Sequence, residues 1–237
     1  MVSDAEFDWI ERQSEDGTFE HLVVATSMPW LLPRALHDIE SWNEALCAGS
    51  RGPRLARLSE KVRRAVDLEH WAAFRKSFDR LAAWFARVGA ADRGDAAPAT
   101  ICVLSGDVHH TYVSEAAYRS RLASRVYQIT CSPIHNTIPT PMRVVFKASW
   151  SHTFERFVKL FSRWAHVPPV PIRWHHPTGP HFGNILALLV LDGRQARLVL
   201  EQAIRADEPD ARRKDASKAK LVVTKELTLT ETQRPTA

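Results

Sequence analysis

Two short runs of apolar, β-branched residues constrain the fold of this 237-residue chain most. Residues 21–27 (His-Leu-Val-Val-Ala-Thr-Ser) and 100–105 (Thr-Ile-Cys-Val-Leu-Ser) each have the length and composition of a buried strand. Helix-like stretches separate them, and the turn signal Asp192-Gly193 joins two further apolar runs near the end of the chain. Strands separated by helices and followed by a hairpin predict an α/β sandwich.

Several segments between and after these strands have helical spacing. A short helix capped by Asp4 comes first, and Pro33 begins a second helix. The clearest helix is capped by Asp67, and its apolar side chains recur every three or four residues: Trp71, Phe74, Phe78, Leu81, Phe85 and Val88. Residues 150–164 repeat this aromatic spacing. We expect both stripes to pack in the core.

The remaining strands complete the predicted architecture. A third strand is expected at residues 126–131 and the hairpin strands at 185–202, all in one mixed sheet with helices on one exposed face. Residues 221–230 alternate well enough for one last edge strand. The predicted organisation is a domain over residues 1–205, a charged linker over 206–220, and an edge strand with a tail over 221–237.

Composition excludes several classes of protein. Hydrophobic residues make up 45% of the chain and charged residues 25%, which is ordinary for a globular domain. No apolar run approaches the roughly 18 residues of a membrane span. Seven acidic residues in the first twenty predict no signal peptide and, by default, a cytoplasmic location. Cys47, Cys102 and Cys131 are too far apart for a zinc ribbon or a disulfide framework.

The residues that carry chemistry follow the second predicted strand directly. Gly106 is expected to permit a sharp turn, after which an acid and two histidines come at the carboxyl end of the strand, where open α/β sheets bind ligands. If the backbone stays extended, Asp107 and His109 point to one side and could reach one cation. This donor pair suits Zn, Fe, Mn or Ca, although two ligands do not complete a site. The alternative is that Asp107 caps the following turn and the histidines are solvated.

The residues around this motif resemble a known family. The string Val103-Leu-Ser-Gly-Asp-Val-His-His-Thr-Tyr-Val-Ser-Glu-Ala116 resembles the Gly-Asp-x-His motif of the alkaline phosphatase D (PhoD-like) family, metallophosphoesterases of the calcineurin-like fold. Four flanking segments resemble the same family: residues 22–33, 67–81, 131–136 and 182–184. The resemblance covers residues 1 to about 204. It implies a metallophosphoesterase-type sandwich, of which this chain is similar to the C-terminal half.

The resemblance also implies roles for individual residues. His109 matches the metal-binding histidine of the family, and Asp107 matches the acid of the same loop, as a ligand or as the residue that orients one. His110 is the candidate catalytic residue, lying near the phosphate or, alternatively, exposed. His135 and Asn136 could line the rim of the crevice, or serve only as a surface histidine and a loop cap.

The implied activity is hydrolysis of a phosphate ester substrate at a dinuclear site of Ca, Fe, Mn or Zn. The family requires further Asp- and Asn-bearing segments before Gly106, and these are absent here. We therefore expect a fragment that is inactive alone and completed by a separate half-domain or by a homo-oligomer. Tight metal binding by the chain itself would need additional ligands, with four candidates: His135, His175, His176 and His181.

A binding module without catalysis is the alternative function. The net charge of +5 and the basic residues between Arg51 and Arg64 could attract nucleic acid, but no nucleic-acid module signature accompanies them and we expect no such partner. The helix at residues 150–164 is the best amphipathic candidate for a membrane surface. A serine hydrolase is disfavoured because the chain has no Gly-x-Ser-x-Gly motif.

Overall fold

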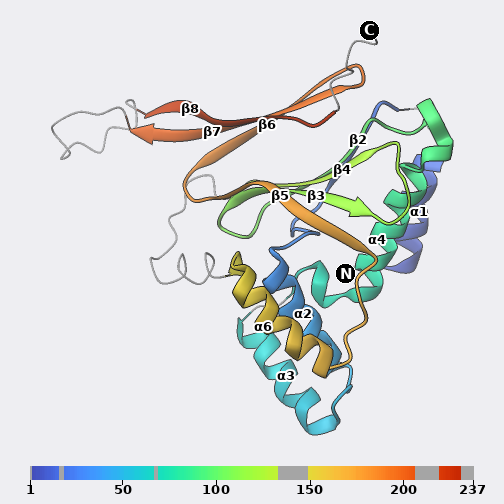
Figure 1. The fold of residues 1–237 in the computed structure, drawn as a ribbon, viewed down its shortest axis with the longest axis vertical. Coiled ribbons are helices and arrows are strands. Elements are labelled where there is room, and N and C mark those ends of the chain that lie inside the picture. The colour runs from blue at the N-terminus through green and yellow to red at the C-terminus, as the bar shows by residue number, and fades with distance from the viewer. Residues whose placement is uncertain (1, 16–18, 67–68, 133–148, 206–218, 231–237) are drawn as a thin grey trace.

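The computed structural model describes residues 2–15, 19–66, 69–132, 149–205 and 219–230 (Figure 1). The helical elements are α1 (Asp4–Glu15), α2 (Arg34–Cys47), α3 (Pro53–Val66), η1 (Trp71–Ala73), α4 (Arg75–Val88), η2 (Ala91–Ala96) and α6 (His152–Trp164). The strands are β1 (His21–Ala25), β2 (Thr100–Ser105), β3 (Thr111–Tyr118), β4 (Arg125–Thr130), β5 (Ile172–His181), β6 (Ile185–Asp192), β7 (Gln195–Arg205) and β8 (Ala219–Thr228).

A five-stranded sheet of mixed orientation lies at the centre of the molecule. Its strand order is β1-β2-β4-β3-β5. The strands β1, β2 and β4 are parallel, whereas β3 runs antiparallel to both β4 and β5. Helices flank this sheet (Figure 1). The prediction of an α/β fold built on a mixed sheet with flanking helices is confirmed.

Both faces of the interior strand β2 are buried. Ile101 and Val103 lie in a core cluster with helical residues such as Phe78 of α4. Cys102, on the opposite face, lies in a second cluster with Leu198 of β7. A strand that is covered on both faces needs apolar residues at successive positions, and this explains the continuous apolar run at residues 100–105.

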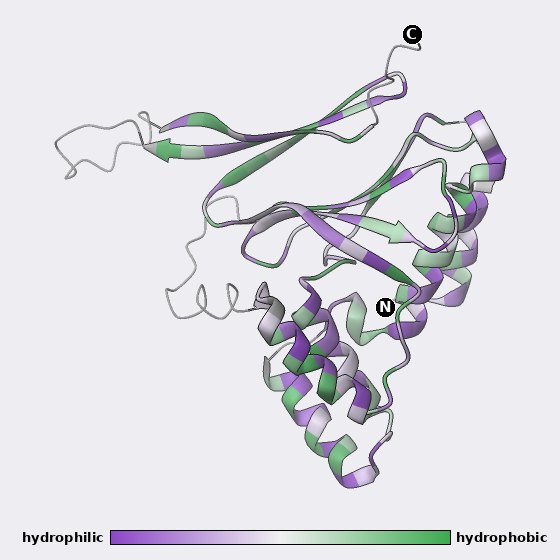
Figure 2. Cartoon of the chain, in the orientation of Figure 1, coloured by the Kyte–Doolittle hydropathy of each residue, from purple (hydrophilic) through white to green (hydrophobic). Residues whose placement is uncertain are grey.

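The terminal hairpin belongs to a separate sheet. The strands β6, β7 and β8 form an antiparallel three-stranded sheet in that order. The prediction that residues 185–202 join the central mixed sheet is therefore wrong, whereas the expected last edge strand is confirmed as β8. The physical reason is the alternation of side chains along β7. Ala196, Leu198 and Leu200 are buried against the central sheet, so β7 packs face to face with that sheet and does not pair with its strands. Figure 2 shows the apolar character of β6.

Two strands of the central sheet were not expected from the sequence. The strand β5 has the sequence Ile-Arg-Trp-His-His-Pro-Thr-Gly-Pro-His, which is typical of a loop. It is tolerated as a strand because it lies at the sheet edge, where proline costs least, and its pairing with β3 contains register irregularities. The second unexpected strand is β3, which pairs with β5.

Two predicted helix starts need correction or fall outside the structure. Ser3, rather than Asp4, caps α1: the Glu6 backbone N–H donates to Ser3 Oγ at 3.3 Å, and the Ser3 N–H donates to Glu6 Oε2 at 2.8 Å. This reciprocal pair is a capping box. Asp67, the predicted cap of the next helix, lies outside the described residues.

The long helix expected from Trp71 onward is interrupted. A short 3-10 turn, η1, comes first, and α4 begins only at Arg75, because Phe74 has φ −129° and ψ 67°, which are not helical values. The apolar stripe itself packs in the core as predicted, since Phe78, Leu81 and Phe85 are at most 3% exposed.

The aromatic stripe of α6 does not pack as predicted. Phe157 and Leu160 are 56% and 59% exposed, and Phe161 and Trp164 are also exposed, whereas Val158 is buried. The helix α6 lies beside α2. Ser162 Oγ of α6 donates a hydrogen bond to the Asp38 carbonyl of α2 at 3.1 Å. The prediction of core packing is wrong for Phe157, Phe161 and Trp164. Together with Leu160, these residues form what we call the α6 apolar face.

Candidate functional site

The Gly-Asp-x-His motif lies at the carboxyl edge of the parallel strands. The backbone N–H of Thr26 donates to the Leu104 carbonyl at 3.0 Å, and that of Gly106 donates to the Ser27 carbonyl at 3.3 Å. On the other side, the Cys131 N–H donates to the Ser105 carbonyl at 2.9 Å. The segments that follow β1, β2 and β4 therefore start side by side, and the motif emerges at the edge where open α/β sheets bind ligands.

The motif turns through left-handed residues. Asp107 has φ 67° and His109 has φ 55°, whereas Gly106 has no positive φ. The backbone is therefore not extended at Asp107 and His109, so the condition for both side chains to point to one side is not met. Both side chains are nevertheless exposed, and Val108 between them is buried. Left-handed conformations are uncommon for non-glycine residues, although Asp and His adopt them more readily than most.

The alternative interpretation, in which Asp107 caps the following turn and both histidines are solvated, is confirmed only for His109. The carboxylate of Asp107 accepts no hydrogen bond from the part of the chain that the structure describes, including the turn that follows it. Asp107 is therefore not a cap of that turn. His109 is solvated, as the alternative predicts, but His110 is not.

His110 is buried in an aromatic cluster. Its side chain is 0% exposed, so the alternative that it is exposed is wrong. The ring stacks on Tyr112 with 5.2 Å between centroids and contacts Trp150 and Phe182 at 6.0 and 5.8 Å. Nδ1 donates to the Val108 carbonyl at 2.6 Å, so in the neutral ring Nε2 carries the lone pair. Burial lowers the pKa of His110 to about 4, so the imidazole is uncharged at neutral pH.

The strand β5 brings three more histidines beside the motif. His181 pairs in register with Thr111, directly after the motif, and accepts or donates a hydrogen bond with Thr178 Oγ1 at 2.6 Å. His176 Nδ1 lies 2.9 Å from Ser114 Oγ, and burial lowers its pKa to about 4. His175 is exposed, with Nε2 3.5 Å from a Glu115 carboxylate oxygen. From the sequence we expected these histidines to be possible metal ligands, but no pattern predicted that one strand would carry all three.

These side chains do not form a complete metal centre. In the described ranges of the chain, no three His, Cys, Asp or Glu side chains are grouped so that they could hold a metal ion. His135 and Asn136, the predicted rim residues, lie outside the described residues. Asp107 and His109 supply at most two protein ligands, fewer than a catalytic zinc or a dinuclear site requires.

A polar pair between α2 and the residue before η1 escaped the sequence analysis. His70 Nδ1 lies 2.7 Å from the Glu40 carboxylate, which is almost fully buried. His37, one turn earlier on α2, is also buried, packed between Phe78 and Trp174 at 4.9 Å from each ring, and burial holds its pKa well below the usual value. No spacing signal in the sequence distinguishes these residues from a solvated helix face.

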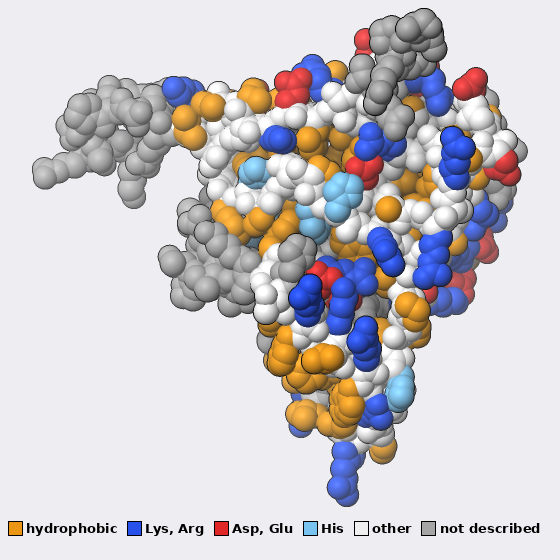
Figure 3. All heavy atoms as spheres, in the orientation of Figure 1, with side chains coloured by type: hydrophobic (Ala, Val, Ile, Leu, Met, Phe, Trp, Pro, Cys, Tyr) orange, Lys and Arg blue, Asp and Glu red, His pale blue; other side chains and the backbone are white. Residues whose placement is uncertain are grey.

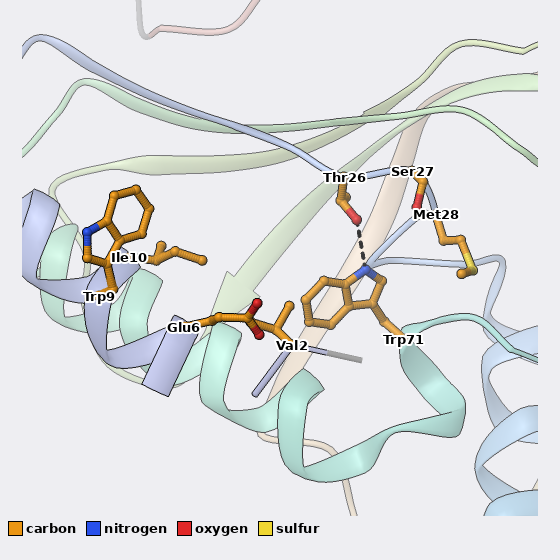
Figure 4. Close-up of a pocket in the computed structure, with 8 residues that line it drawn as sticks. All are labelled: Val2, Glu6, Trp9, Ile10, Thr26, Ser27, Met28 and Trp71. Atoms are coloured by element: carbon orange, nitrogen blue, oxygen red, sulfur yellow. Dashed lines mark hydrogen bonds between the residues drawn. The ribbon is translucent and has the colours of Figure 1, made fainter. Parts of the chain in front are cut away.

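A cavity of about 470 Å³ opens at the carboxyl end of β1 (Figure 4). The indole Nε1 of Trp71 donates to Thr26 Oγ1 at 3.2 Å across it. Its carboxylate, Glu6, is exposed and bonded to Ser3, whose backbone and hydroxyl groups lower the pKa of Glu6. Because this carboxylate serves the cap of α1 and the other lining residues are mostly apolar, the cavity has little capacity for acid–base chemistry.

Comparison of the chain with protein-family models, curated proteins and solved structures finds no match. The resemblance to the PhoD-like family therefore stays a prediction from the motif and its flanking segments. In the described ranges, no helix has both the length and the hydropathy needed to cross a bilayer.

Proposed function

We propose that this chain contributes to metal-dependent hydrolysis of phosphoric esters, with Asp107 and His109 binding a divalent cation. The observation that carries the proposal is the conformation of the motif at the carboxyl edge of β2. Two potential ligands, Asp107 and His109, are exposed there in left-handed conformations, with the buried Val108 between them. The proposal that this loop binds metal for phosphoester hydrolysis comes from its resemblance to PhoD-like metallophosphoesterases.

A bound divalent cation supplies an acidified water and stabilises charge on the phosphoryl oxygens. On the protein side, Asp107 provides a carboxylate oxygen and His109 an imidazole nitrogen. Their left-handed backbone keeps both side chains in solvent, where a substrate can reach them.

His110 is retained as the candidate catalytic residue. With Nδ1 held by the Val108 carbonyl, Nε2 is the atom at which the ring would take up or release a proton. The proposed role is proton donation to the leaving oxygen, and it requires the substrate to reach a ring that is 0% exposed in this structure.

The proposal requires ligands beyond the two exposed ones. A catalytic zinc ordinarily has three protein ligands, and a two-metal site needs more. A separate half-domain or a second copy of the chain as their source stays a prediction. Incomplete coordination also predicts weak binding, roughly millimolar for a metal, because a site with few preorganised ligands binds less tightly.

The test uses three substitutions to asparagine, which tolerates the left-handed conformation. Asp107→Asn and His109→Asn remove the proposed ligands. His166→Asn is the matched control, because His166 is also exposed and has φ 60°. Hydrolysis of bis(p-nitrophenyl) phosphate and p-nitrophenyl phosphate, and calorimetric metal binding, are measured with Mn, Zn and Ca.

Metal-dependent turnover, or weak metal binding, that His166→Asn retains and both loop variants lose would support the proposal. Identical behaviour of all four proteins would refute it.

Binding to a membrane surface is the second candidate function, favoured by the α6 apolar face. Figure 3 shows hydrophobic side chains gathered over the region of α6. Arg156, Lys159 and Arg163 lie on the same helix, a combination typical of helices that lie in the headgroup region of anionic membranes. Phe157→Ser should reduce co-sedimentation with anionic vesicles, whereas Leu188→Ser on the exposed face of β6 should not. Equal co-sedimentation of both variants with wild type would exclude α6 as the contact.

A further inference from the structure

A cleft of about 900 Å³ lies between α6 and β5, outside the loop that carries Asp107 and His109. Five cationic side chains line it: Arg34, Arg119, Lys159, Arg163 and Arg173. Figure 3 shows Lys and Arg side chains gathered on this face between β5 and α6. We call it the α6–β5 cleft, and we infer that it binds a ligand carrying phosphate groups with two or more negative charges.

Two of the five cations are already paired. Lys159 forms an ion pair with Glu155, which also lines the cleft. Arg34 forms a 3.4 Å ion pair with Asp38, and its guanidinium lies 4.5 Å from the ring centre of Trp174. These contacts fix the position of both side chains and neutralise much of their charge.

The other three cations have no such partner among the described residues. Arg119, Arg163 and Arg173 are exposed, and none forms an ion pair or a side-chain hydrogen bond with the part of the chain that the structure describes. They come from three separate places: the residue after β3, the last turn of α6 and the start of β5. Like charges repel one another in a concave site, and a bound anion relieves that repulsion. A cleft that collects three unpaired arginines from three elements is therefore suited to an anion.

The chemistry of arginine points to phosphate. The planar guanidinium presents parallel N–H donors that match two oxygens of a phosphate group. The cleft is larger than one phosphate requires, and its volume is typical of sites for small organic ligands. Trp150 and His176, whose ring centroids are 4.3 Å apart with the ring planes tilted by 52°, also line it and offer aromatic contacts for the organic part. An organic phosphate in solution and a phospholipid headgroup share this chemistry.

The cleft adjoins the candidate metal loop through the aromatic cluster. Trp150 lines the cleft and also contacts the His110 ring, with 6.0 Å between centroids. The assignment of the cleft to the substrate of phosphoester hydrolysis rests on the proposed function. The binding of an anion there does not.

The test measures binding without metal, so that it is independent of hydrolysis. The full chain is titrated calorimetrically with inorganic pyrophosphate in EDTA at low salt. Arg119→Ala, Arg163→Ala and Arg173→Ala should each weaken binding by about fivefold, the upper end expected of one exposed ion pair. Arg57→Ala on α3 removes the same charge from an exposed position outside the cleft and is the matched control. Added salt should weaken the wild-type affinity, because the arginines are exposed.

A second arm separates the two sources of phosphate. Phosphatidylcholine vesicles with and without phosphatidic acid replace pyrophosphate, with the same variants. Weaker pyrophosphate binding in the cleft variants, but not in Arg57→Ala, supports a soluble ligand. Binding to phosphatidic acid alone, lost in the same variants, supports a lipid headgroup. Binding of neither probe, or cleft variants that equal Arg57→Ala, would overturn the inference.

Discussion

His176 should make the protein sensitive to mild acid. Burial lowers the pKa of His176 to about 4 from an ordinary 6.5, with a smaller contribution from the neighbouring His175. In the unfolded chain the same histidine takes up a proton as the pH falls through 6.5, whereas in the folded protein it stays neutral until about pH 4. The unfolded state therefore binds more protons in this window, and the free energy of unfolding falls as the pH falls from about 6.5 to 4.

The magnitude follows from the two pKa values. Between pH 7 and pH 5, this linkage removes about 2 kcal/mol of the free energy of unfolding. His176→Asn removes the titrating group and keeps a polar atom near the position of Nδ1, which lies 2.9 Å from Ser114 Oγ. The variant should therefore lose about 2 kcal/mol less than the wild type between these two pH values.

Urea unfolding followed by tryptophan fluorescence measures this difference, since the chain has eight tryptophans. His166→Asn, at an exposed left-handed position, should lose as much stability as the wild type. Parallel curves of stability against pH for the wild type and His176→Asn would refute the reasoning. They would mean that the His176 ring takes up a proton in the folded protein as readily as in the unfolded chain.

Two further substitutions test the packing around the site. Tyr112→Phe leaves the Leu31 carbonyl, which accepts from the Tyr112 hydroxyl at 2.9 Å, without its buried donor, and should lower the free energy of unfolding by about 1–3 kcal/mol. An unchanged urea midpoint would contradict the role of this bond. Gly179→Ala places a Cβ 2.5 Å from Tyr112 Cβ at φ 109° and should destabilise the fold by more than about 2 kcal/mol. Gly49→Ala, at φ 89° with no atom within 4 Å of its Cβ, should cost less, and thermal melts that rank the two variants the other way would contradict the steric argument.

The sequence predicted those elements whose burial leaves a periodic trace. The run at residues 100–105 was recognisable because both faces of β2 are covered, and the α4 stripe because Phe78 and Phe85 face the core. The strand β5 was not recognisable, since its prolines and histidines are permitted only by its place at a sheet edge, which pairing decides. The spacing on α6 predicted a helix correctly, but amphipathic spacing does not say whether the apolar side meets protein or solvent.

The candidate site was predictable in its location and not in its geometry. Placement of the Gly-Asp-x-His segment after β2 followed from the sequence, because the glycine and the acid follow an apolar run. The left-handed backbone of Asp107 and His109 did not, since either residue also adopts the common conformations. The α6–β5 cleft depends on tertiary convergence of Arg119, Arg163 and Arg173, which lie far apart in the chain or on different elements and have no shared motif.

The left-handed residues have a consequence for any survey of tolerated substitutions. At φ 67° and 55°, positions 107 and 109 would reject β-branched and bulky residues even in a protein with no ligand to bind. A mutational library selected only for folding should therefore return glycine, asparagine, aspartate and histidine at both positions. If the same few residue types recur at positions 107 and 109, their recurrence would therefore reflect the backbone conformation of the turn. Only the difference between aspartate and asparagine at position 107, and between histidine and asparagine at position 109, separates selection for chemistry from selection for backbone conformation.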